Sequence, residues 1–212
     1  MNKLESNPTQ YKHKGFTSRL LHSTAYPWIV VLMSCLFLFY KYIAQVSPSV
    51  MTDELMSHFA LHATGFAELI AVYFPAYLIS QLLAGPMLDR FSARWLSCIA
   101  ILFMSVSVFE FSEATLLWQG YLCRACMGAG AAFATVSYLK LAAAWFSDQK
   151  FAYVSGWLAT AASAGGMMAQ TPIAYSISHV GWQQTLRFCS LLGVVIAVIY
   201  SLLVRDNKPS AP

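Results

Sequence analysis

The stretch PWIVVLMSCLFLFYKYIAQV, residues 27–46, is apolar along almost its whole length, and its single charged side chain is Lys41. About 20 such residues in a helix cross the hydrocarbon core of a bilayer, so we predict a transmembrane helix here. Further apolar runs follow at residues 65–84, 95–111, 116–139, 152–177 and 186–204. The sequence therefore predicts an all-α membrane protein with six transmembrane helices.

The composition supports the same class of protein. The chain has 212 residues, of which 58% are hydrophobic and 10% are charged, whereas a soluble domain carries about 25% charged residues. Most of its surface must therefore face the lipid bilayer. The net charge of +4 does not indicate a nucleic-acid-binding protein, because the Lys and Arg residues form no basic tract.

The connections between the apolar runs alternate in charge. Basic residues lie before the first run, between the second and third, around the end of the fourth and after the sixth: Lys3, Lys12, Lys14, Arg19, Arg90, Arg94, Lys140, Lys150, Arg205 and Lys208. The other connections contain no Lys or Arg, and hold Asp53, Glu54, Glu113 and His179. Since Lys and Arg favour the cytoplasmic side, we expect a cytoplasmic tail at 1–26, a transmembrane bundle at 27–204 and a cytoplasmic tail at 205–212. The first tail lacks the apolar core of a signal peptide.

The connection between the second and third runs reads GPMLDRFSAR, residues 85–94. Its spaced Gly, acidic and basic positions are Gly85, Asp89, Arg90 and Arg94. This stretch resembles the signature of the major facilitator superfamily in the same connection, which is close to G-x-x-x-D-R-x-G-R-R, with Ser92 in place of the usual Gly. We expect Asp89 near a helix N-terminus, where an anion gains roughly 0.3–1 kcal/mol. The resemblance implies a cytoplasmic loop that latches onto another bundle, and a plain topology-setting loop is the alternative.

The resemblance continues downstream. RACMGAGA at 124–131 is similar to the family's R-x-x-x-G-x-G-x pattern in the fourth span, and WFSDQK at 145–150 is similar to the next connection. GWQ at 181–183 is like a Gly-Trp-Arg that precedes the sixth span, with Gln183 as a departure. The resemblance implies the amino-terminal six-helix half of a 12-helix secondary transporter, a symporter or uniporter, in a bacterial inner membrane.

Two charges lie well inside the apolar runs, Lys41 in the first and Arg124 in the fourth. A charge at the centre of a span costs roughly 2.5–3.5 kcal/mol on insertion scales, so it usually faces a cavity or a partner. In the resembled fold these spans line the central cavity, which implies substrate binding, or proton coupling for Arg124. Two cations favour an anionic or zwitterionic solute, such as a carboxylate, phosphate ester, amino acid or small peptide. The alternatives are snorkelling for Lys41 and a structural ion pair for Arg124.

Weaker candidates for the substrate cavity follow from helical spacing. They lie four residues from Lys41 or at intervals of four along the second run: Gln45, Tyr73, Tyr77 and Gln81. A packing face whose hydroxyls bond neighbouring helices is the alternative for the stripe on the second run. Glu68 is a candidate partner of Lys41 or a proton carrier, and an exposed outer position is its alternative.

We expect no metal, cofactor or catalytic residue. His58 and His62 form an H-x-x-x-H pair, but a zinc site needs more ligands than two. Cys123 and Cys126 form a C-x-x-C with no second Cys pair or His nearby, so we interpret them as small lipid-phase residues. An intramembrane protease would need a Gly-x-Ser-Gly nucleophile and a His inside a later span, and the sequence offers neither.

Two interpretations of function remain. The first is transport of a small solute by alternating access around a midplane site. The second is a truncated or split product without transport of its own, because the resembled transporters have two bundles with the cavity between them. One bundle alone is expected to leave Lys41 and Arg124 facing lipid. We therefore expect a second six-helix bundle, or a second copy of this chain, as a partner.

Overall fold

The computed structural model describes residues 25–206, and all regular secondary structure in that range is helical. The helices are α2 Tyr26–Val46, the 3-10 helix η1 Ser47–Val50, α3 Thr52–His58, α4 Ala63–Ala71, α5 Tyr73–Arg90, α6 Ala93–Glu113, α7 Leu117–Trp145, α8 Asp148–Met168, α9 Thr171–Val180 and α10 Trp182–Leu203. Almost all of both predicted tails falls outside the described residues, including Lys3, Lys12, Lys14, Arg19 and Lys208.

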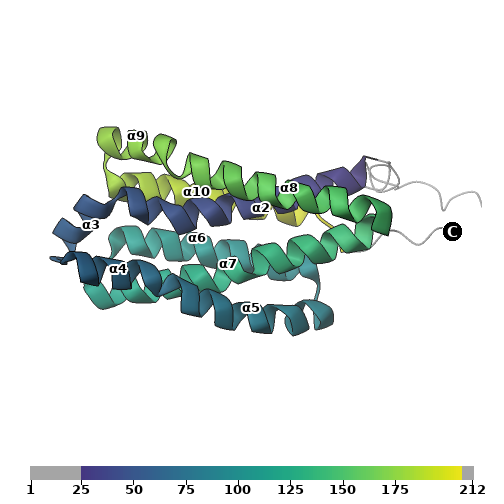
Figure 1. Cartoon of the computed structure of the whole chain (residues 1–212), viewed down its shortest axis with the longest axis horizontal. Coiled ribbons are helices and arrows are strands. Elements are labelled where there is room, and N and C mark those ends of the chain that lie inside the picture. Colours follow the sequence, from purple (N-terminus) through teal and green to yellow (C-terminus); the bar gives the residue numbers. More distant parts are fainter. Residues whose placement is uncertain (1–24, 207–212) are drawn as a thin grey trace, which may run out of the picture.

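The long helices run side by side along one axis (Figure 1). α2 begins and α10 ends at the same end of the bundle, which we call the terminal end, and α3 and α9 lie at the opposite end (Figure 1). α7 is the central helix, because it packs against α2, α5 and α6. α6 and α7 form a helical hairpin joined by residues 114–116.

Within residues 25–206, five helical segments are long and apolar enough to cross a membrane. They are Tyr26–Val50, Ala63–Arg90, Ala93–Glu113, Leu117–Trp145 and Trp182–Leu203. These segments contain the first three predicted runs and all but one residue of the fourth and of the sixth. Their outward faces are mostly apolar, and the exposed residues on α10 include Leu191, Val195, Val198 and Leu202. The chain is an integral, multi-pass membrane protein.

The fifth predicted run, 152–177, is split between α8 and α9. The interruption lies at Gln170, whose φ of −95° and ψ of −89° are not helical. Pro172 follows in the first turn of α9, where its missing N–H and fixed φ suit a helix start but not a helix interior. The described part of the chain therefore has five candidate spans and this interrupted pair, so six continuous spans are not observed.

The helical hydrogen bonding of the second span is also interrupted, at Val72 between α4 and α5, although Val72 keeps a helical φ of −55° and ψ of −26°. Pro75, in the first turn of α5, has no N–H to offer the Ala71 carbonyl four residues earlier. α7 approaches this break closely, because a Cβ on Gly128 would lie 2.2 Å from the Tyr73 carbonyl oxygen. Only a residue without a side chain fits there, so the break and α7 lie in direct backbone contact.

Candidate functional site

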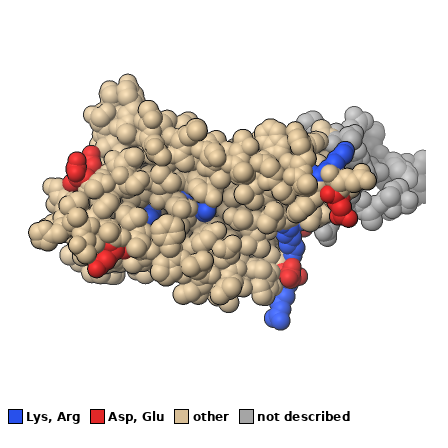
Figure 2. Space-filling view, in the orientation of Figure 1, with Lys and Arg blue, Asp and Glu red and all other residues tan. Residues whose placement is uncertain are grey.

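Lys41 lies in the second half of α2 and Arg124 in the first third of α7, and both side chains are buried, with exposed fractions of 4% and 0%. Figure 2 shows blue atoms at mid-length on an otherwise tan face, whereas the other charged side chains in view gather at the two ends. The expectation that a single bundle leaves both cations facing lipid is wrong. Neighbouring aromatic rings and backbone cover them.

The ammonium of Lys41 is held by aromatic rings. Its Nζ lies 3.9 Å from the ring centroid of Tyr42 on α2 and 5.0 Å from that of Tyr77 on α5. Such cation–π contacts contribute about 0.5–2 kcal/mol each, more when the cation is desolvated. No hydrogen-bond acceptor or acidic group among residues 25–206 pairs with this Nζ, so its three N–H donors remain available.

Tyr73 and Tyr77 join the two cations into one cluster. Their rings stack with centroids 6.1 Å apart and an interplanar angle of 11°. The Arg124 guanidinium carbon lies 5.0 Å from the centroid of Tyr73. The Tyr73 hydroxyl donates to Gln45 Oε1 at 3.5 Å, a long hydrogen bond. The structure thus brings together five of the six residues that the sequence predicts for the cavity.

Arg124 donates to backbone and to a thioether. Its Nη1 lies 3.2 Å from the Ala44 carbonyl and 3.8 Å from Met127 Sδ, and its Nη2 lies 3.4 Å from the Ile70 carbonyl. The two ion pairs among the described residues, Lys140–Asp89 and Arg187–Glu113, do not include it. The ion-pair alternative for Arg124 therefore has no partner in the described part of the chain.

Two candidates lie outside this cluster's contacts. Gln81, the sixth cavity candidate, is half-buried on α5. Glu68 is exposed on α4, and its Oε2 accepts a hydrogen bond of 3.4 Å from the Tyr121 hydroxyl. Its contact is with α7 and not with Lys41.

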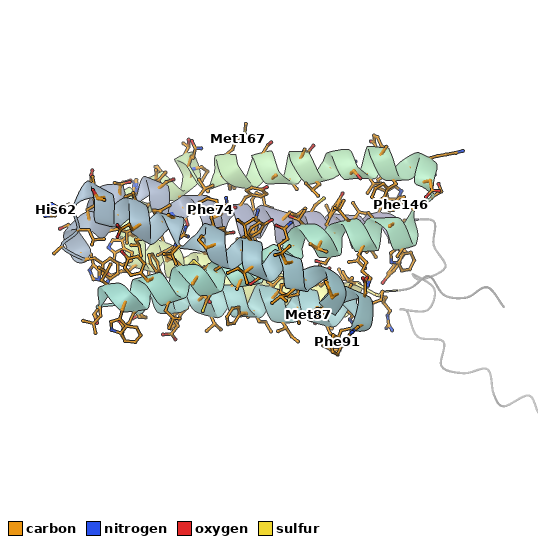
Figure 3. The ribbon with its side chains drawn as sticks, turned by 60° about the horizontal axis from the view of Figure 1, so that its bottom comes forward. His62, Phe74, Met87, Phe91, Phe146 and Met167 are labelled. Carbon is orange, nitrogen blue, oxygen red and sulfur yellow. The ribbon has the colours of Figure 1, made fainter. Side chains whose placement is uncertain are left out.

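The GPMLDRFSAR stretch is mostly helical and not a loop. α5 continues to Arg90, so only Phe91 and Ser92 connect it to α6. Figure 3 shows Phe91 and Phe146 towards the same end of the bundle, with His62 at the other. We predicted a loop from residue 85 because Gly85-Pro86 is typical of a helix end. Pro86 instead lies inside α5. The connection is therefore shorter than we predicted.

Asp89 lies in the last turn of α5, so the expectation of a helix N-terminus is wrong. The helix dipole disfavours an anion there. Lys140 on α7 compensates, because its Nζ lies 3.3 Å from Asp89 Oδ1 and also donates to the Leu88 carbonyl. Exposed fractions of 79% for Asp89 and 37% for Lys140 place this pair at the surface.

Asp206 is the carboxylate that occupies a helix N-terminus in this region. It accepts hydrogen bonds from the backbone N–H of Arg94 at 2.7 Å and from the Ser92 hydroxyl, at the start of α6. The Arg94 guanidinium in turn donates from Nε to the Ser201 carbonyl, 2.9 Å away in the last turn of α10. The helix dipole favours the anionic Asp206 at the N-terminus of α6 and the cationic Arg94 at the C-terminus of α10. These two side chains therefore connect the start of α6 to the end of α10. Sequence analysis missed Asp206, although Ser92 before an apolar run was a signal for an N-cap.

Two hollows lie away from the cation cluster. A groove of about 410 Å³ between α2 and α8 is lined by apolar residues, among them Phe39 and Trp157. At 3.6 residues per turn, Phe39 and Lys41 lie on opposite faces of α2, so this groove does not include the Lys41 ammonium. A pocket of about 270 Å³ at the terminal end is lined by Asp89, Lys140 and Asp206 among others.

Comparison with known proteins gives a consistent result. The family model described as Major Facilitator Superfamily matches residues 16–212. The chain is 26% identical over 168 residues to a probable L-galactonate transporter of Escherichia coli K12, covering 79% of this chain and 37% of the relative. It is 23% identical over 188 residues to the hexuronate transporter of the same organism, covering 85% and 43%. It is 22% identical over 192 residues to a probable galactarate/D-glucarate transporter of Bacillus subtilis 168, covering 87% and 42%.

A solved structure shows the same fold. The bacterial homologue of the human lysosomal transporter Spinster, in an inward-facing and occupied conformation, superposes with a TM-score of 0.78 at 16% identity, over 88% of this chain and 46% of that one. The unoccupied inward-facing conformation gives a TM-score of 0.75. The chain spans about two fifths of the length of the curated relatives it matches.

Proposed function

Because the chain belongs to the major facilitator superfamily, we propose that it forms one bundle of a secondary transporter that moves a small organic anion by alternating access. The buried ammonium of Lys41 carries this proposal. It is buried in the second half of α2, it meets only aromatic rings, and no acid among residues 25–206 neutralises it. A bound carboxylate would offset the cost of burying that charge.

Sugar acids are the substrate class we propose. The three relatives are named for L-galactonate, galactarate or D-glucarate, and hexuronate, and each of these solutes combines carboxylate with several hydroxyls. Lys41 would bind a carboxylate, while Gln45, Tyr77 and Gln81 offer amide and phenol groups to the hydroxyls. Proton coupling through Glu68 stays a prediction.

A second six-helix bundle completes the cavity in this proposal. It comes from further chain or from a second copy, and the greater length of the relatives supports the first source. The termini face the cytoplasm of a bacterial inner membrane, which the loop charges and the bacterial relatives support. The alternative function is a fragment that does not transport by itself.

Uptake into proteoliposomes tests the proposal. Labelled L-galactonate is offered to the complete gene product and to the 212-residue chain, each as wild type and as Lys41→Gln. Lys150→Gln is the matched control, because it removes the same charge from an exposed site. We expect saturable uptake by the complete gene product, its loss in Lys41→Gln and its retention in Lys150→Gln. Uptake that is indifferent to Lys41 overturns the proposal, and uptake by the complete product but not by the 212-residue chain supports the fragment alternative.

A further inference from the structure

We infer that Arg124 is a positioning residue that ties together two proline-interrupted helix ends, and that Lys41 alone of the two buried cations meets the substrate. This inference rests on the proposed function. It separates two residues that the sequence analysis treated as equivalent.

The first tie is to the end of α2. In an α-helix the carbonyl of residue i accepts the N–H of residue i+4, and four residues after Ala44 comes Pro48, which has no N–H. The N–H of Ser47 is already used by the Ile43 carbonyl. Arg124 Nη1 donates to the Ala44 carbonyl at 3.2 Å. It therefore supplies the hydrogen bond that the proline removes, one residue before Gln45.

The second tie is to the end of α4. Ile70 lies in the last turn of α4, where carbonyls lack helical partners, just before the interruption at Val72. Arg124 Nη2 donates to the Ile70 carbonyl at 3.4 Å. Backbone polar groups freed by a broken helix must be satisfied from within the protein in a membrane. One guanidinium thus holds the break before Tyr73 and the end of α2 at a fixed separation.

Enclosure removes Arg124 from the solute. Its side chain has no exposed area, the Tyr73 ring covers it at 5.0 Å, and Gly128 one turn later brings α7 against the Tyr73 backbone. Its Nε has no hydrogen-bond partner among the described residues, yet that atom is enclosed with the rest of the side chain. A carboxylate would have to displace two backbone hydrogen bonds to be bound here. Lys41 keeps all its donors free, so it is the cation that recognises the substrate.

Selectivity for a carboxylate follows from the free ammonium of Lys41. L-Galactonate and galactitol share a six-carbon chain and carry one and no carboxylate. Among residues 25–206, Lys41 is the buried cation whose donors are free to pair with that carboxylate. We expect the complete gene product in detergent to bind L-galactonate more tightly than galactitol.

Two variants separate the roles. Lys41→Gln is expected to weaken L-galactonate binding roughly tenfold to hundredfold, the value of a charged hydrogen bond, and to leave galactitol binding unchanged. Arg124→Lys keeps the charge but loses the planar fork that reaches two carbonyls. It is expected to weaken binding of L-galactonate and galactitol by the same factor. Loss of carboxylate binding alone in Arg124→Lys overturns the inference while leaving the proposed function intact. Lack of any effect in Lys41→Gln overturns the proposed function instead.

A suppressor variant tests the tie directly. Pro48→Ala restores an N–H four residues after Ala44, so it should partly rescue L-galactonate binding in Arg124→Gln, giving a positive coupling in the double-mutant cycle. If Arg124→Gln does not fold, the same cycle is measured with Arg124→Lys. Additive effects of the two substitutions contradict the proposed tie.

Discussion

The rings of Tyr73 and Tyr77 lie nearly parallel, 11° apart, with their centroids separated by 6.1 Å. Tyr77 also faces the ammonium of Lys41. We expect Tyr77→Ala to weaken binding of an anionic solute by roughly 2- to 30-fold, because it removes a cation–π contact of about 0.5–2 kcal/mol that holds Lys41 in place. Equilibrium binding of L-galactonate measures this. Tyr77→Phe retains the ring and should change affinity little, and equal effects of both variants would mean that the hydroxyl is what matters.

Gly128→Ala should destabilise the bundle by about 1–3 kcal/mol, the usual cost of overpacking. The added Cβ would lie 2.2 Å from the Tyr73 carbonyl oxygen, which as backbone cannot move aside cheaply. Gly156→Ala is the control, since a Cβ there meets no atom within 4 Å. A thiol-reactive fluorophore reports unfolding, because Cys98, Cys123 and Cys189 are buried and free. Matching unfolding midpoints for the two variants would contradict the close approach.

Asp206→Ala should lower the stability of the bundle by about 0.5–2 kcal/mol, the value of a lost helix N-terminal cap. The carboxylate accepts hydrogen bonds from Arg94 and Ser92 at the start of α6. Asp206→Asn keeps one acceptor oxygen but loses the charge, so its unfolding midpoint in the same fluorophore assay should lie between those of wild type and Asp206→Ala. A midpoint for Asp206→Ala equal to that of wild type would show that the tie is not stabilising.

Lys140→Gln should be more destabilising than Asp89→Asn. The exposed ion pair is itself worth about 0–1 kcal/mol, but Lys140 also donates to the Leu88 carbonyl in the last turn of α5. Thermal unfolding at low and high salt checks this, because only the ion-pair component is screened by salt. Equal losses that both vanish at high salt would mean that the Leu88 contact contributes nothing.

Cysteine labelling in intact cells tests the orientation. Asp53→Cys, exposed on α3, should react with a membrane-impermeant maleimide, whereas Arg90→Cys should react only after permeabilisation. The unsubstituted chain is the control for its five native cysteines. The reverse pattern would overturn the cytoplasmic placement of both termini.

The positions of most membrane-spanning helices were predictable from the sequence, because each span is a continuous run of apolar residues. The residues around Gly85 and Pro86 show the limit of that reading. The pair is typical of a helix end, yet helix formers after it continue α5 to Arg90. The break before Pro172 was not predicted, because the apolar run continues through it, although a proline that cannot donate to the preceding turn was a local signal for it.

The sequence predicted most of the residues that form the candidate site, but it did not predict which groups each of them contacts. Helical spacing placed Lys41 with Gln45 and aligned Tyr73 with Tyr77, and the structure brings all four together. Arg124 donates to backbone carbonyls 80 and 54 residues away. Every residue has a backbone carbonyl, so the residue types in the sequence do not indicate these partners. The hydrogen bond from the Arg94 backbone N–H to Asp206, 112 residues away, was likewise not predictable from residue types.

The interruption of helical hydrogen bonding at Val72 gives the second span a point at which it can bend. α4 has nine residues, so at 1.5 Å per residue it is about 13 Å long, and a tilt of about 10° at this point would move its far tip by about 2 Å. The 3.4 Å contact between Tyr121 and Glu68 lies along α4, so such a swing would make or break it. Because Arg124 Nη2 donates to the Ile70 carbonyl beside Val72, such a bend would displace the far end of α4 more than the residues next to Arg124.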